Sequence, residues 1–172
     1  LVAENLAQAL GEVAEQAEEG TDLANRWVAE SYAVRAAKVM LKLAQTANRV
    51  IDLSIAQGAL IDATKDKRPV IQMLAGWILA HLAGPDAQHA VAAMALAETN
   101  AMNVRLVAFG SLAVSAKLNG SLLDDETIDA VYSLVGSQQI DHELRGAAAA
   151  AFGALNLPSR KVKNLILDQA KS

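Results

Sequence analysis

Three histidines, His81, His89 and His142, are the side chains of this sequence best suited to metal binding or proton transfer near neutral pH. None of them has a second histidine four residues away, which is the spacing that lets one face of a helix bind zinc. The sequence contains no cysteine, so disulfides, thiolate nucleophiles and zinc–thiolate sites are absent. These residues predict no metal site and no cofactor.

Four carboxylates lie close together in the sequence, at Asp124, Asp125, Glu126 and Asp129. They stand where a helix is expected to begin, and acidic side chains are favoured there by unpaired backbone N–H groups. A calcium loop would need a glycine among its ligands, and this segment has none. We therefore interpret the cluster as helix capping.

No nucleophile or phosphate-binding motif accompanies these acids. Gly110-Ser111 and Gly136-Ser137 lack the strand-to-helix turn around a hydrolase serine. The chain has neither a glycine-rich phosphate loop with lysine nor a dinucleotide fingerprint. The sequence therefore predicts a protein that is not an enzyme.

Three bases, Arg35, Lys38 and Lys42, share one face of an expected helix and could contact phosphates. Residues 21–69 hold eight bases and five acids, and the whole chain has a net charge of -4. A solvated helix surface is the favoured explanation of these bases, and nucleic-acid binding is the less favoured hypothesis.

The elements that would position these side chains are helices. Hydrophobic residues make up 53% of the sequence but aromatic residues only 3%, and alanine and leucine favour helices over strands. No apolar run reaches the ~20 residues of a membrane span, and the chain begins at Leu1 without a signal-peptide pattern. We expect a cytoplasmic protein without a membrane contact, cut from a larger one.

Glycine, proline and capping residues separate apolar stripes of helical period. The expected helices are 2–18, 22–46, 48–63, 68–83, 86–98, 103–118, 124–136, 141–156 and 159–170. Their short connections predict antiparallel neighbours, and no segment alternates like a strand. We predict an all-α domain over 1–172, in which 1–47 is a capping or degenerate hairpin and 48–172 holds repeats.

The repeats are aligned on Arg68, Arg105 and Arg145, which are 37 and 40 residues apart. Eight residues beyond each arginine stands a small side chain, at Gly76, Ala113 and Gly153. A column of small residues predicts close packing of neighbouring helices, and a period near 40 residues is typical of stacked helix pairs.

The segments Val104-Arg105-x-x-Ala108 and Leu144-Arg145-x-Ala147-Ala148 resemble the HEAT repeat, especially its bacterial, phycobilin-lyase-like variety. The resemblance covers roughly residues 48–172 and implies an α-solenoid with the arginine-bearing helices on its concave face. It also allows an accessory role, as subunit or domain, in a lyase-type system that attaches a cofactor to another protein.

Two helices lack a strongly polar face. Residues 146–156 carry no charge, and within 70–80 only Gln72 is polar. Alanine tolerates water, so this face could simply be exposed, or it could be covered by a partner, a second copy or a missing domain. We predict a scaffold that binds protein. The candidate contacts are the arginines and glutamine near the predicted face, together with the two aromatic residues best suited to anchor a partner. These residues are Arg68, Gln72, Trp77, Arg105, Phe109 and Arg145.

Overall fold

The computed structural model describes residues 23–46 and 50–157, with side chains from residue 32 onward. Every element in these ranges is a helix and none is a strand, which confirms the all-α prediction. The elements are α2 (Leu23–Gln45), the 3-10 helix η1 (Leu53–Ala56), α3 (Gln57–Ala63), α4 (Pro69–Leu79), α5 (Pro85–Leu96), α6 (Met102–Asn119), α7 (Asp125–Gly136) and α8 (His142–Ala154). The expected helices 2–18 and 159–170 lie outside the described residues.

The helix expected over 48–63 begins later than predicted. Asp52 accepts a hydrogen bond from the backbone N–H of Ser54 at 2.9 Å, and a 3-10 turn follows before α3 starts at Gln57. A short side chain that binds a nearby backbone N–H competes with the regular helical bond. The predicted helix is confirmed over Gln57–Ala63 and is wrong over residues 50–52, which are not helical.

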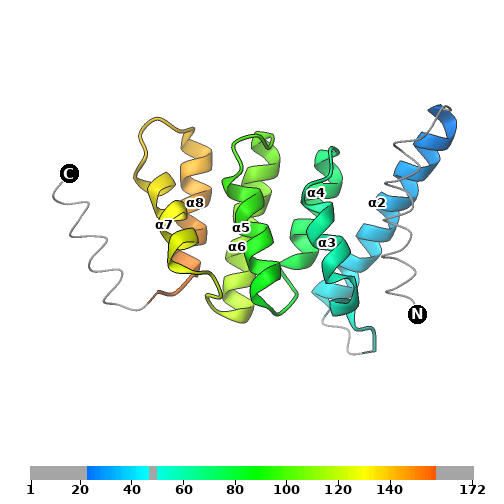
Figure 1. Cartoon of the computed structure of the whole chain (residues 1–172), viewed down its shortest axis with the longest axis horizontal. Coiled ribbons are helices and arrows are strands. Elements are labelled where there is room, and N and C mark those ends of the chain that lie inside the picture. Colours follow the sequence, from blue (N-terminus) through cyan, green and yellow to red (C-terminus); the bar gives the residue numbers. More distant parts are fainter. Residues whose placement is uncertain (1–22, 47–49, 158–172) are drawn as a thin grey trace.

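The helices lie in two layers (Figure 1). In one layer, α2 packs against α4, α4 against α6, and α6 against α8, and we call this the inner layer. In the outer layer, α3, α5 and α7 each pack against the inner helix that follows them in the chain. Each outer helix and its inner partner run antiparallel, so the inner helices α4, α6 and α8 all begin at the same edge.

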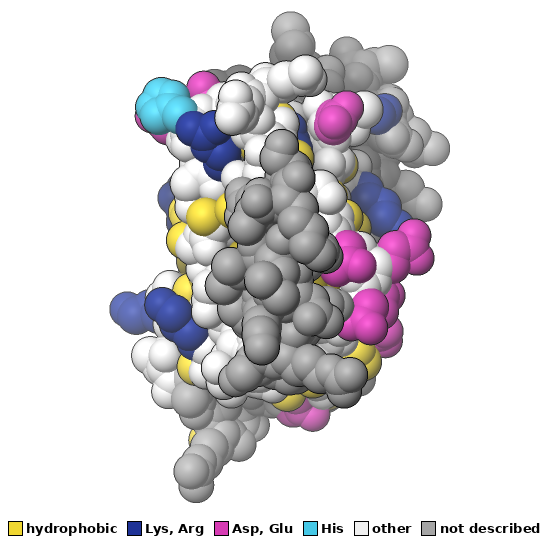
Figure 2. Space-filling model, turned by 90° about the vertical axis from the view of Figure 1, so that its left-hand side faces the viewer, with side chains coloured by type: hydrophobic (Ala, Val, Ile, Leu, Met, Phe, Trp, Pro, Cys, Tyr) yellow, Lys and Arg dark blue, Asp and Glu magenta, His cyan; other side chains and the backbone are white. Residues whose placement is uncertain are grey.

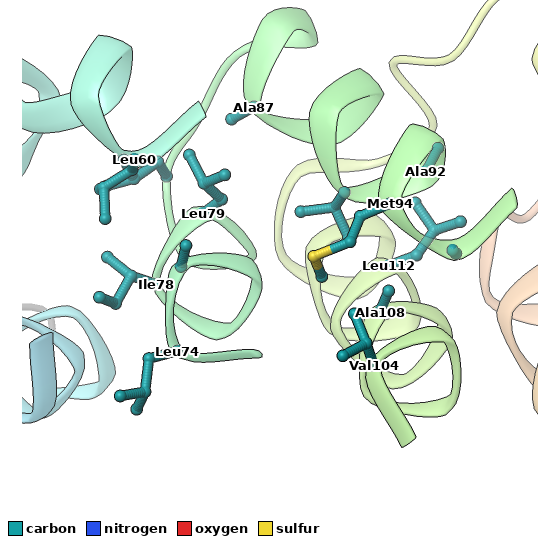
Figure 3. Packing of buried hydrophobic residues seen from close by; sticks show 14 of the residues in the cluster. Leu60, Leu74, Ile78, Leu79, Ala87, Ala92, Met94, Val104, Ala108 and Leu112 are labelled. Carbon is teal, nitrogen blue, oxygen red and sulfur yellow. The ribbon is translucent and has the colours of Figure 1, made fainter. Parts of the chain in front are cut away.

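One continuous apolar core runs between the layers, from Met40 on α2 to Ala151 on α8. Figure 3 shows part of it, with Leu74 and Ile78 on α4 and Leu112 on α6. Many core positions are alanines, whose small side chains let helices pack closely. A second, smaller cluster around Leu155 closes the end of α8.

Gly76 is the glycine for which close helix packing is evident. A methyl group added there would overlap the Cε atom of Met94, which is itself buried. Gly110 also lies inside a helix, but a methyl group there would meet nothing within 4 Å. Alanine stabilises a helix interior by about 1 kcal/mol relative to glycine.

We therefore expect Gly110→Ala to raise the free energy of unfolding by about 1 kcal/mol. Gly76→Ala should lose most or all of this gain, because the Met94 methyl group must move within a packed core. Urea unfolding followed by circular dichroism measures both values. Equal gains in the two variants would show that α4 and α5 are not in tight contact at Gly76.

Candidate functional site

Arg105 and Arg145 occupy equivalent places, each as the fourth residue of an inner helix. The Nε atom of Arg105 donates to the carbonyl oxygen of Ala95 at 3.0 Å, at the end of α5. The guanidinium of Arg145 donates to the carbonyl oxygen of Ser137 at 3.3 Å, at the end of α7. Each arginine thus binds one of the carbonyl groups that the preceding helix leaves unpaired.

The equivalent residue of α4 is Gln72, not Arg68. Gln72 is buried, and its Nε2 atom donates to the carbonyl oxygen of Thr64, just after α3, and to Asn100 Oδ1, both at 3.1 Å. The alignment of Arg68 with the other two arginines was therefore wrong by one helical turn. The aligned positions are Gln72, Arg105 and Arg145, and three residues beyond each stands a buried alanine.

Arg68 immediately precedes α4 and pairs with Asp66, with Nε to Oδ1 at 2.8 Å and Nη2 to Oδ2 at 2.6 Å. Burial acts to raise the pKa of Asp66, but the hydrogen bonds and charge of Arg68 outweigh it and lower that pKa. The Arg68–Asp66 pair lies at the N-terminal end of α4, and the hydrogen bonds of the aligned residues to backbone carbonyl groups attach each inner helix to the preceding outer helix. Because Arg68, Gln72, Arg105 and Arg145 make these contacts within the chain, we leave them out of the candidate surface.

Arg105→Ala is expected to lower the free energy of unfolding by about 1.5–3 kcal/mol, because a charged hydrogen bond to the end of α5 is lost. Thermal unfolding would measure the change. Lys117→Ala is the matched control, since Lys117 is an exposed base of the same helix. Equal stability of the two variants would mean that the Arg105 bond does not hold α5 and α6 together.

The two aromatic candidates differ sharply in position. Phe109 is 0% exposed and is the largest of the fully buried side chains, so it cannot anchor a partner in this fold. Trp77 is 41% exposed. Of the two aromatic candidates, Trp77 is the one that the structure leaves accessible to a partner.

Trp77 is one of several exposed apolar side chains on the inner layer. On α4, Val70 and Trp77 are exposed and Met73 is half-buried between them. On α6, Met102, Val114 and Leu118 are exposed apolar side chains. On α8, the exposed positions after the first turn are Gly146, Ala149, Ala150 and Gly153. We call these positions, together with Gly110, the inner-layer face.

The size of the side chains differs across this face. Large apolar side chains lie on α4, whereas a methyl group added at Gly110, Gly146 or Gly153 would meet nothing within 4 Å. The predicted column of Gly76, Ala113 and Gly153 as close-packing residues therefore holds for Gly76 and is wrong for Gly153. Gly153 is exposed on α8, as Gly110 is on α6.

Several acidic side chains gather over the outer layer, at the start of α7. In Figure 2 most of the acidic side chains lie on the right-hand side, whereas basic and hydrophobic side chains are seen on both sides. Asp124 caps α7 by accepting from the backbone N–H of Thr127 at 2.7 Å, and this bond lowers the pKa of Asp124. Asp125 and Glu126 follow in the first turn of α7. The capping interpretation of this cluster fits the geometry.

Gln88 is a residue whose importance the sequence reasoning missed. It is 0% exposed, and its Nε2 atom donates to Ser115 Oγ and to the carbonyl oxygen of Gly120. Its Oε1 atom accepts from the backbone N–H of Leu122 at 2.7 Å. The signal was available, because Gln88 lies on the same helical stripe as the apolar Val91, Ala92 and Ala95.

The described part of the chain holds no group of three His, Asp or Glu side chains able to bind a metal ion. Arg35, Lys38 and Lys42 are exposed on one side of α2, as their spacing predicts. Within residues 23–46 and 50–157, every helix is too short or too polar to span a bilayer.

Comparison with protein-family models, with curated proteins and with solved structures found no match to this chain.

Proposed function

We propose that this chain is a non-catalytic, HEAT-like α-solenoid segment that binds protein through the inner-layer face. The main observation behind this proposal is that the large exposed hydrophobic side chains are unevenly distributed between the two layers. Of the nine exposed large hydrophobic side chains in the described part, seven belong to α2, α4 and α6 and none to α5 or α7. The acidic cluster lies on the outer layer instead.

The repeated helix pairs support the HEAT-like part of the proposal. The fourth residue of α4, of α6 and of α8 donates to a carbonyl group at the end of the preceding outer helix. Such stacking makes an extended surface from one face of every pair, which is how helical-repeat proteins bind their partners. The resemblance noted in the sequence implies that these same helices line the concave face of a solenoid.

The character of the inner-layer face supports a protein partner over a small molecule. Most of its exposed positions are apolar or glycine, and Asn103 and Lys117 are the polar exposed positions near the two ends of α6. An exposed tryptophan beside uncharged surface is typical of a protein interface, in which aromatic residues supply much of the binding energy. Accessory work in cofactor attachment remains a prediction that no described residue favours.

Site-specific photo-crosslinking in cells tests the proposal. A photoreactive amino acid replaces Ala150 on the inner-layer face or, as the control, Ala130 on α7, and both positions are exposed helical alanines. We expect a discrete crosslinked protein from position 150, lost when Trp77→Glu is added, and none from position 130. Equal crosslinking from both positions would reject the inner-layer face as the binding surface.

The exposed basic stripe of α2 favours nucleic-acid binding as a second candidate function. Three phosphate contacts, by Arg35, Lys38 and Lys42, would give a binding constant that falls with salt at a logarithmic slope of about -2 to -3. Fluorescence anisotropy with labelled single- and double-stranded DNA measures this slope. A slope that Lys38→Glu leaves unchanged would reject the stripe as the contact.

A further inference from the structure

We infer that the exposed side of α2 binds single-stranded nucleic acid, with Arg35, Lys38 and Lys42 on the phosphates and Tyr32 stacked on a base. The inference rests on the second candidate function and names the form of nucleic acid that this helix takes. Proteins that bind single strands combine a basic surface that follows the backbone with aromatic side chains that stack on unpaired bases. Both features are present on α2.

The three bases and the tyrosine lie on one side of the helix. At about 100° per residue, Tyr32 and Lys38 lie about 60° to either side of Arg35, and Lys42 lies between Arg35 and Lys38. All four side chains are exposed, and Tyr32 is 60% exposed. From Tyr32 to Lys42 this basic stripe is about 15 Å long, which matches about four nucleotides at the ~3.4 Å spacing of stacked bases.

The fold does not use the positive charge of the basic stripe. Residues 32–46 contain three bases and no acid. Within the described part of the chain, none of these bases forms an ion pair or a side-chain hydrogen bond. The described helix that packs most closely against α2 is α4, which carries no charged residue. Glu30 precedes the stripe, but its spacing from Arg35 places it about 140° around the helix.

The acidic cluster at the start of α7 lies away from the basic stripe. Figure 1 shows α2 and α7 at opposite ends of the described helices, with α4 and α6 between them. Packed helices are about 8–10 Å apart, so the distance exceeds the ~10 Å over which charges act at 0.1 M salt. A phosphate strand can therefore approach α2 although the chain has a net charge of -4.

Tyr32 favours a single strand over a duplex. In a duplex the faces of the bases are covered by their neighbours, so an aromatic side chain stacks best on bases that are unpaired. An anionic membrane is a poorer match, because a helix that lies in a membrane surface needs its apolar side free for lipid. The apolar side of α2 is buried in the core at Ala33, Ala37 and Met40.

Fluorescence anisotropy with the full 172-residue chain tests the inference. The labelled probes are an oligothymidylate of about 12 nucleotides, the same strand without bases and a duplex of the same length, in about 20 mM salt. We expect Tyr32→Ala to weaken oligothymidylate binding at least about fivefold, because one stacked base is lost. Tyr32→Phe keeps the ring and should keep the affinity. Val39→Ala, at an exposed apolar residue of the same helix, should leave it unchanged.

The strand without bases separates stacking from charge. It carries the same phosphates, so the wild-type chain should bind it about as weakly as Tyr32→Ala binds the oligothymidylate. Tyr32→Ala should not weaken this binding further. Polyglutamate, an acidic polypeptide, should bind no more tightly than the strand without bases. Circular dichroism checks that each variant is folded.

Oligothymidylate binding that Tyr32→Ala leaves unchanged would overturn the inference, and the second candidate function would still stand if Lys38→Glu weakened that binding. Equal affinity for the oligothymidylate and for the duplex or polyglutamate would also overturn it. A chain that binds none of these probes up to roughly 300 µM would overturn both the inference and the second candidate function, but not protein binding through the inner-layer face.

Discussion

Phe109→Ala is expected to lower the free energy of unfolding by about 3–5 kcal/mol, the usual range when a buried phenylalanine is truncated. Phe109 is fully buried and belongs to the core between the layers, so the variant leaves a cavity where α6 meets its neighbours. Folded domains are stable by only about 5–15 kcal/mol. The variant should therefore unfold at far lower urea concentration, as followed by circular dichroism at 222 nm.

Trp77→Ala is the matched comparison, since Trp77 is the other aromatic side chain that the sequence marked as a partner anchor. It is 41% exposed and loses less apolar burial on truncation, so we expect a change of about 1–2 kcal/mol. Binding to the inner-layer face should respond in the opposite order, with Trp77→Ala weakening it most. Greater destabilisation by Trp77→Ala than by Phe109→Ala would mean that the two side chains are placed wrongly.

Gln88→Met should lower the free energy of unfolding by about 3 kcal/mol or more, although it keeps the volume of the side chain. The variant leaves the Leu122 N–H, the Gly120 carbonyl and the Ser115 hydroxyl without their bonds to Gln88. A buried polar group that loses its partner is destabilising by about 1–3 kcal/mol. Because these bonds join α5 to the end of α6 and the following loop, we also expect faster amide hydrogen exchange over 120–124.

Gln139→Met, at an exposed position between α7 and α8, is the control for this prediction and should change stability by less than about 0.5 kcal/mol. Thermal unfolding of the two variants beside the wild type makes the comparison. If Gln88→Met behaved like Gln139→Met, the hydrogen bonds of Gln88 would not stabilise this end of the fold.

The helices were predictable because their signals are local. Gly84-Pro85 marks the start of α5, and Asp124 and Asp141 cap α7 and α8 through their side chains. The expected helix 103–118 agrees with α6 to within one residue at each end. Where a side chain redirected the backbone, as Asp52 does before α3, the apolar period alone gave the wrong start.

The register of the repeats was harder to predict, because a shared residue type can occupy different places. Arg68 looks like Arg105 and Arg145 in the sequence, but Pro69 is the first residue of α4 and places Arg68 before the helix. Proline favours this first position, so the signal was present. Gln72 takes the equivalent place with a different side chain, and only its bond to the Thr64 carbonyl makes the equivalence visible.

The binding candidates were predictable only in part, since apolar spacing does not say which side of a helix is covered. The inner helix α6 packs against α4, α5 and α8, so most of its circumference is apolar. Phe109 and Val114 therefore look alike in the sequence, yet Phe109 is buried and Val114 is exposed. The uncharged stretches over 70–80 and 146–156 did point to the helices that form the inner-layer face.

Oxidative footprinting tests most directly whether the inner-layer face is covered by protein in the cell. Trp77 and Met102 are oxidisable side chains exposed on this face, and Tyr132 of α7 is a half-buried reference on the other layer. We predict that Trp77 and Met102 are oxidised much less in cells than in the purified chain at low concentration, while Tyr132 reacts equally in both. Equal oxidation of Trp77 and Met102 in the two settings would contradict it.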